Sequence, residues 1–215
     1  MKEKLLHLAK NPFSLVTYLL TRLPYFRFIR DTTDYQCRIN FGLWFKQKVL
    51  NWGGNREAYW PVHWTSKIYD VDRIVVGVDA YPGYMNGCYI QGKGGIEIGD
   101  YTQVAPNVAI VSANHDLYDT RKHIEAPVHV GKYCWIGAGA TILPGTNLGD
   151  WTIVGAGAVV TKSFPDGFCV IAGNPARVIK VLERDKCVPF HNKVRYHGYL
   201  RDDKFERRYQ NKSHS

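Results

Sequence analysis

Three of the eight histidines in this 215-residue chain lie in one short stretch, at His115, His123 and His129. The same stretch supplies polar neighbours for them, namely Asn114, Asp116, Asp119 and Glu125. An imidazole titrates near neutral pH, so a histidine on a loop can remove a proton from a hydroxyl group. Histidines in a group can also ligate zinc. The stretch therefore indicates either general-base catalysis or a metal site.

A six-residue repeat surrounds this stretch and predicts the scaffold that positions it. The first position of each repeat is aliphatic nine times, at Ile98, Val104, Ile110, Val130, Ile136, Ile142, Leu148, Val154 and Val160. The chance of this run is on the order of one in a million at ordinary amino-acid frequencies. The second position is usually Gly or Ala, which permits close approach of a neighbouring backbone. The fifth position is small or β-branched, as expected of an inward-facing site.

Three repeats predict one turn of a solenoid. Segments IGDY, VGKY and LGDW, which begin at Ile98, Val130 and Leu148, fall on one face, and the intervening repeats form two others. Each coil would stack its apolar ladder on the next and so give a prism with a continuous core. Val76 and Ile90 are expected to belong to earlier, less regular coils. Periodicity alone leaves the handedness open.

The period is interrupted once, between Ile110 and Val130, by an excess of about fourteen residues. Insertions in solenoids form loops on one face, which often carries the function. We therefore expect residues 112–129 to form an active-site loop.

The chain divides into three expected parts. Residues 1–60 carry no repeat and are expected to form a mainly helical cap, because the end of a solenoid must be covered. Residues 61–176 form the β-helix domain and end at the turn signal of Gly173, Asn174 and Pro175. Residues 177–215 form a C-terminal tail with a short helix, and its first residues leave the prism as a strand or a helix.

Charge and cysteine content restrict the classes of partner. The net charge of +9 comes mainly from the two flanks of the chain. No nucleic-acid-binding motif accompanies this charge, so acidic partners such as CoA phosphates or lipid headgroups fit better than nucleic acid. The five scattered cysteines lack CxxC pairs and indicate neither a disulfide framework nor structural zinc, which favours a reducing cytoplasm.

The N-terminal region predicts no signal peptide, and its apolar stretch, Phe13 to Leu20, is too short to span a bilayer. Basic residues flank this stretch, at Lys10, Arg22, Arg27 and Arg30, in the manner of an interfacial helix. The region therefore either packs on the domain or associates with the inner face of a membrane.

Four motifs together resemble one known family. The hexads, SANHD in the interrupting loop, the run CWIGAGATILPGTNLGDWTIVGAGAVVTKSFP and the terminal GNPAR resemble the hexapeptide-repeat O-acetyltransferases of the galactoside, maltose and surface-polysaccharide type. The likeness covers about residues 60–182. It implies a left-handed parallel β-helix, an exception to the right-handed crossover rule. It also implies a homotrimer with active sites between subunits, acetyl-CoA as co-substrate, no metal, and a carbohydrate acceptor in surface polysaccharide or glycoconjugate biosynthesis.

The resemblance also implies roles for individual residues. His115 matches the general base that activates the acceptor hydroxyl for direct attack on the thioester, without an acyl-enzyme. The backbone N–H of Ala138 matches the oxyanion donor, and Trp135 a wall of the CoA channel. Other positions match the lining of the CoA groove: Ala156, Thr161, Lys162, Arg177 and Lys180.

The acceptor side departs from the family pattern. The family's acceptor-binding asparagine matches Met85 here, and Asn86 is adjacent. We expect Tyr84, Asn86 and Asp116 to contact the acceptor. A group of aromatic residues before the repeat either stacks sugar rings or packs the cap: Trp44, Trp52, Tyr59, Trp60 and Trp64.

Three alternatives remain open at this point. N-acetylation of an amino sugar would need the same base. A zinc carbonic anhydrase would share the prism, but two of its ligands lie five residues apart, whereas His123 and His129 are six apart. A non-catalytic scaffold, docked through its basic flanks, would have no use for His115.

Overall fold

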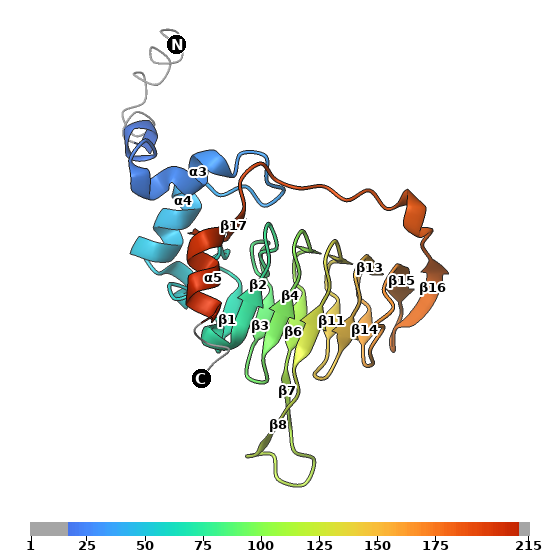
Figure 1. Ribbon diagram of the computed structural model, residues 1–215. Coiled ribbons are helices and arrows are strands. Elements are labelled where there is room, and N and C mark those ends of the chain that lie inside the picture. The colour runs from blue at the N-terminus through green and yellow to red at the C-terminus, as the bar shows by residue number, and fades with distance from the viewer. Residues whose placement is uncertain (1–16, 211–215) are drawn as a thin grey trace.

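Short parallel strands stack into three sheets, which form the sides of a prism (Figure 1). The computed structural model describes residues 17–210. Sheet A contains β1 (Lys67–Tyr69), β3 (Tyr89–Gln91), β6 (Ala109–Val111), β11 (Thr141–Ile142) and β14 (Val159–Val160). Sheet B contains β2 (Ile74–Val76), β4 (Ile96–Ile98), β9 (Val128–Val130) and β12 (Asn147–Leu148). Sheet C contains β5 (Gln103–Val104), β10 (Trp135–Ile136), β13 (Thr152–Val154), β15 (Cys169–Ala172) and β16 (Arg177–Val181).

The strand register confirms the predicted coil of three hexads. Val130 pairs with Leu148, eighteen residues later, in sheet B. Sheets C and A repeat this spacing in the pairs Ile136 with Val154 and Ile142 with Val160. The earlier coils predicted around Val76 and Ile90 are also present, since these residues pair with Ile98 and Ile110.

The core is the stacked ladder of first and fifth hexad positions. All nine predicted first positions are buried, with exposures between 0% at Val160 and 6% at Val104. Burying one such aliphatic side chain contributes about 1.5–3 kcal/mol, so the ladder accounts for much of the stability. The predicted close approach at second positions is confirmed at Gly131, where an added Cβ would lie 2.5 Å from the Asp150 nitrogen.

The N-terminal region forms a helical cap over the first coils, as predicted (Figure 1). Its elements are a helix at 17–20, η1 (Pro24–Phe26), α3 (Arg27–Asp31), α4 (Phe41–Trp44), η2 (Phe45–Val49) and η3 (Trp52–Gly54). Asn40 caps α4, because its Oδ1 accepts a 2.9 Å hydrogen bond from the Leu43 N–H. Gln47 is buried in the cap and bonds the backbone of residues 55–62.

The described part of the cap contains no helix that is long and apolar enough to cross a membrane. The predicted interfacial segment begins at Lys10, and its portion before residue 17 lies outside the described residues.

The C-terminal tail contains strands and a hairpin in addition to the predicted short helix. After the prism, β16 turns back and pairs antiparallel with β15, which resolves the predicted strand-or-helix choice in favour of a strand. The chain then passes η5 (Arg184–Lys186) and returns along the prism to the cap (Figure 1). There it forms the hairpin of β17 (Tyr196–His197) and β18 (Leu200–Arg201), followed by α5 (Asp202–Gln210).

Candidate active site

The long loop between β6 and β9 projects from the prism as a hairpin of β7 (Ala113–His115) and β8 (His123–Glu125) (Figure 1). His115 pairs with His123 across this hairpin, and their ring centroids lie 4.5 Å apart. The His115 Nδ1 lies 2.5 Å from the Thr120 carbonyl oxygen. A carbonyl only accepts hydrogen bonds, so in the neutral ring Nδ1 carries the proton and Nε2 keeps its lone pair. The exposed His115 ring can therefore accept a proton at Nε2.

Asp116 organises the turn that follows His115. Its Oδ1 accepts hydrogen bonds of 2.8 Å from the backbone N–H groups of Tyr118 and Asp119. These bonds lower the pKa of Asp116, so the carboxylate stays ionised and holds the loop tip in shape. Tyr118 at this tip is 99% exposed. All of these contacts lie within the loop, and the contact of Asp116 with an acceptor stays a prediction.

One corner of the prism, where sheet C passes to sheet A, carries three other predicted residues, namely Asn86, Ala138 and Ala156. Backbone hydrogen bonds stack this corner, from Asn107 N–H to the Asn86 carbonyl and from Gly157 N–H to the Ala138 carbonyl. The corner column therefore runs through Asn86, Pro106, Ala138 and Ala156 in successive coils. Gly139 and Gly157 follow the two alanines at φ +67°, the left-handed conformation that glycine adopts without strain.

The N–H groups of Ala138 and Ala156 are free donors at the exposed surface of this column. Within the part of the chain that the structure describes, neither N–H has a hydrogen-bond acceptor. Pro106 occupies the equivalent position one coil earlier and has no N–H at all. Free backbone donors in a row suit a ligand with carbonyl or amide oxygens.

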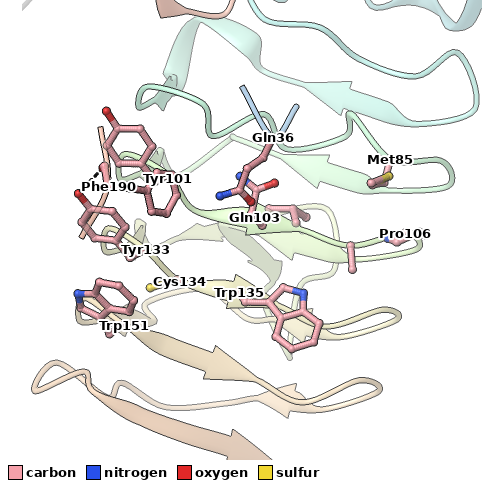
Figure 2. A pocket seen from close by; sticks show the side chains of 12 residues that line it. Gln36, Met85, Tyr101, Gln103, Pro106, Tyr133, Cys134, Trp135, Trp151 and Phe190 are labelled. Carbon is pink, nitrogen blue, oxygen red and sulfur yellow. Dashed lines mark hydrogen bonds between the residues drawn. The ribbon is translucent and has the colours of Figure 1, made fainter. Parts of the chain in front are cut away.

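Beside this column lies a groove of about 450 Å³ on the outer surface of sheet C (Figure 2). Trp135 stands on its floor, with 55% of its surface exposed. Met85 and Pro106 line one side, and Tyr133 and Trp151 line the other. The predicted wall residue Trp135 thus faces an open groove next to Ala138.

The remaining predicted CoA residues lie elsewhere on the prism. Thr161 and Lys162 are exposed where sheet A passes to sheet B, the corner that also carries the His115 loop. The Lys162 ammonium lies 5.6 Å from the Phe164 ring centroid. Arg177 and Lys180 are exposed on β16 at the end of sheet C. One chain therefore places His115 and the Ala138 column at different corners.

The described residues include no group of three His, Cys, Asp or Glu side chains arranged to hold a metal ion. His129 lies on sheet B, where its Nδ1 is 3.0 Å from Glu97 Oε2, whereas His115 and His123 lie in the hairpin. The buried thiols are poor nucleophiles, because burial raises the pKa of Cys37 and of Cys134 to about 12.

Several residues of the groove on sheet C were not predicted. A ladder of aromatic rings occupies the corner from sheet B to sheet C and consists of Tyr101, Tyr133, Trp151 and Phe168. The returning C-terminal segment adds Phe190, whose ring lies 4.9 Å from that of Tyr101. The aromatic fourth positions of IGDY, VGKY and LGDW carried the signal for three of the rings, whereas Phe190 has no repeat that marks it.

The aromatic residues before the repeat divide between the two predicted roles. Tyr59 and Trp60 are buried in the core, and Trp44 packs edge-on against Phe26. Trp52 and Trp64 are exposed by 51% and 39%. Only these last two are available to a ligand.

Residues 127–162 match the family described as bacterial transferase hexapeptide (six repeats). The stacked coils of three hexads continue this repeat on both sides of the matched segment. The chain belongs to this hexapeptide-repeat transferase family. The prism is accordingly the family's left-handed β-helix, as predicted, and the crossovers are of the exceptional hand.

Similarity to individual members of the hexapeptide-repeat family is partial. Nodulation protein L of Rhizobium meliloti is 43% identical over 76 residues, which are 34% of this chain and 40% of that protein. A galactoside acetyltransferase solved with coenzyme A is 31% identical, with 60% of this chain and 68% of that one covered and a TM-score of 0.49. A maltose O-acetyltransferase from Clostridium difficile 630 is 35% identical, with 56% and 60% covered and a TM-score of 0.41. The chain thus spans about two fifths of nodulation protein L.

Proposed function

We propose that this chain is an O-acetyltransferase that moves the acetyl group of acetyl-CoA to a sugar hydroxyl. The observation that carries the proposal is the His115 ring, held by the Thr120 carbonyl with Nε2 free at the one long interruption of the repeat. A neutral imidazole in this tautomer can accept the proton of a hydroxyl group at Nε2. Relatives that bear acetyltransferase names support the donor and the reaction class.

In the proposed reaction the acceptor hydroxyl oxygen attacks the thioester carbonyl carbon while His115 Nε2 takes the hydroxyl proton. The new C–O bond forms, and the C–S bond breaks when the tetrahedral intermediate collapses. The protonated His115 then returns its proton to the departing CoA thiolate. The Ala138 N–H would donate to the oxyanion, a contribution of typically 10²–10³ in kcat.

The coenzyme would lie along the corner column and Trp135. The free Ala156 N–H suits an amide oxygen of the pantetheine arm. Thr161 and Lys162, together with Arg177 and Lys180 on β16, would meet the coenzyme's phosphates, because cationic side chains pair strongly with them. Within the described part of the chain, the side chains of Thr161, Lys162 and Lys180 make no hydrogen bond, and Arg177 bonds only the adjacent Ala176 carbonyl.

A homotrimer would combine the two separated halves of this site. His115 projects from one corner of the prism and the Ala138 column occupies another, so we propose that each active site takes the base from one subunit and the column from its neighbour. Exposed apolar side chains on the projecting hairpin support such packing, since Leu117 and Ile124 are exposed by 88% and 52%. On this proposal, 112–129 is the active-site loop of a β-helix domain spanning 61–176.

The proposed biological setting is surface polysaccharide or glycoconjugate synthesis in the cytoplasm. Tyr84, Asn86 and Asp116 are the proposed acceptor contacts. Four of the five free cysteines are buried, which is compatible with a reducing compartment.

The proposal is tested by release of free CoA thiol from acetyl-CoA with purified protein. Glycosides, nucleotide sugars and lipid-linked oligosaccharides serve as acceptors, and mass spectrometry locates the acetyl group. His115→Ala should lower the acceptor-dependent rate by about 10²–10⁴ while oligomeric state and circular dichroism stay unchanged. Undiminished transfer by folded His115→Ala would overturn the proposed mechanism.

A further inference from the structure

A second groove, of about 400 Å³, lies where the helical cap meets the first coils. It adjoins the groove on sheet C, because Met85 lines both. The cap contributes Lys46 from η2, and the chain just before β1 contributes His63 and Trp64. The excursion before β3 contributes Tyr84, Met85 and Asn86. We call this space the cap groove.

Hydrogen bonds join two of the segments that line the cap groove, the chain before β1 and the excursion before β3. The His63 N–H donates to the Gly83 carbonyl at 2.8 Å, and the Ser66 hydroxyl donates to the Met85 carbonyl at 2.8 Å. The Gly87 N–H donates to Thr65 Oγ1 at 3.0 Å. This side of the groove is therefore preformed and needs little reorganisation on binding.

The charge in the cap groove is positive. The Lys46 ammonium lies 4.1 Å from the Trp64 ring centroid, so the indole holds it in place. Lys46 has no carboxylate partner within the described ranges, and none of the residues that line the groove is acidic. Burial and the nearby Lys46 lower the pKa of His63, which leaves that ring as a neutral hydrogen-bonding group.

Other groups in the groove suit a carbohydrate. The Asn86 side-chain amide makes no hydrogen bond among residues 17–208 and can bond a hydroxyl. The exposed indole edge of Trp64 and the Met85 side chain, 42% exposed, offer apolar surface to the C–H groups of a sugar ring. Asn86 also heads the corner column that contains Ala138, so a sugar held here lies next to the proposed site of transfer.

We propose that the cap groove binds an anionic sugar of the acceptor, with Lys46 paired to its carboxylate or phosphate. This inference rests on the proposed acetyl transfer for its biological meaning. It assigns the cap, which carries no repeat, the selection of the acceptor.

Binding is measured without acetyl-CoA, so that its outcome is independent of transfer. Ligand-observed NMR with the full chain compares methyl β-glucuronide, glucose 1-phosphate and neutral methyl β-glucoside. We expect the two anionic sugars to bind at least about tenfold more tightly than the neutral one, which corresponds to a single charged contact. The stronger anion identifies which charged group the site prefers.

Two variants and one matched control locate the site. Lys46→Gln and Trp64→Ala should each weaken the anionic sugars about tenfold, and Lys46→Gln should leave the glucoside unchanged. Tyr69→Ala is the control, because Tyr69 is an aromatic residue on β1 that is 50% exposed and lines neither groove, and it should bind like the parent.

Equal binding of charged and neutral sugars, no binding of either anion, or an equal loss in Tyr69→Ala would overturn the inference. Retained binding of the anions with no acetyl transfer to any acceptor would support the cap groove and count against the proposed function alone. Acetyl transfer to an acceptor without binding of the anions would support the proposed function and count against the cap groove.

Discussion

The Nδ1 of His115 points at the carbonyl oxygen of Thr120, 2.5 Å away, within the hairpin that leaves the prism. This contact links the proposed base to the backbone of its own loop. No aspartate or glutamate is needed to orient the ring, because a carbonyl fixes the tautomer equally well. The loop therefore orients the proposed base without help from another element, and the proposed site additionally needs the column of a neighbouring subunit.

The neighbouring histidine provides a first prediction. His123→Phe should keep kcat within about tenfold of the parent, because the His123 side chain makes no hydrogen bond to the described residues and packs against the His115 ring. Loss of a general base, in contrast, costs about 10²–10⁴. Steady-state kinetics of His123→Phe and His115→Phe, with and without EDTA, measure this. Equal losses in both variants and inhibition by EDTA would favour a zinc site instead.

The corner column provides a second prediction. Ala138→Pro removes the proposed oxyanion donor, and Pro106 shows that proline fits this position of the corner. We expect kcat to fall about 10²–10³-fold with the melting temperature nearly unchanged.

Ala156→Pro is the matched control for the column. It removes the same kind of N–H one coil later, where the proposed role is to bind the pantetheine arm. It should therefore raise KM for acetyl-CoA more than it lowers kcat. The reverse pattern in the two variants would exchange the proposed roles.

The separation of His115 from the Ala138 column provides a third prediction. Two variants that are each inactive, His115→Ala and Ala138→Pro, should regain activity when they are co-expressed, because mixed trimers contain some sites with both native groups. Random mixing predicts recovery of an appreciable fraction of parental activity, measured on protein carrying two different affinity tags. Active sites formed within single chains would give no recovery.

Asp79 provides a fourth prediction, on stability. Burial raises the pKa of Asp79 to about 6, although hydrogen bonds from the Cys37 and Gln36 N–H groups oppose the shift. The folded state therefore holds this proton more tightly than the unfolded state. The free energy of unfolding should therefore decrease as the pH rises from about 4 to about 6, by about 3 kcal/mol from this group. Above about pH 6 the contribution of Asp79 should no longer change with pH.

Asp79→Asn isolates this contribution of Asp79. The difference in unfolding free energy between the parent and the variant should change across pH 4–6, as measured by urea denaturation at several pH values. The lost acceptor adds a constant offset. A difference that stays constant over this range would show that Asp79 does not titrate there.

Gln47 provides a fifth prediction. Its side chain is 1% exposed and bonds the carbonyls of Asn55 and Trp60, the Val62 N–H and the Tyr199 hydroxyl. Gln47→Leu should destabilise the protein by about 2–4 kcal/mol, because it leaves these buried groups without partners. Thermal and urea unfolding measure the loss.

Gln36→Leu is the surface control for Gln47→Leu, since the Gln36 side chain is exposed and should change stability by less than about 0.5 kcal/mol. A similar loss in both variants would show that the buried hydrogen bonds are not its cause.

The prism was predictable because its buried aliphatic residues recur at a fixed spacing along the chain. Ile98, Val130 and Leu148 occupy one ladder since each coil repeats the geometry of the one before, and a short pattern therefore fixes many contacts. His115 was predictable because it lies at the one long break of that pattern. The residue roles came from the family resemblance, and they stay predictions.

The cap and the returning tail were not predictable in this way. Lys46 and Trp64 meet through contacts between segments that follow no repeat, and Phe190 meets Tyr101 across 89 positions of the chain. Such contacts depend on tertiary packing, which local pattern does not encode. The sequence accordingly placed the aromatic residues of the cap near a ligand or in a core without deciding between the two roles.

The C-terminal segment that returns from the last coil to the first changes how the solenoid can unfold. In an open solenoid the terminal coils separate first, because each has only one neighbour. Here Tyr196 and His197 bond the cap and the first coil through Tyr35 and the Val76 carbonyl, while β16 covers the last coil. Fraying at either end therefore has to disturb a segment anchored at the other. Amide exchange at the two ends should consequently respond together to a single cut in the residues that connect them.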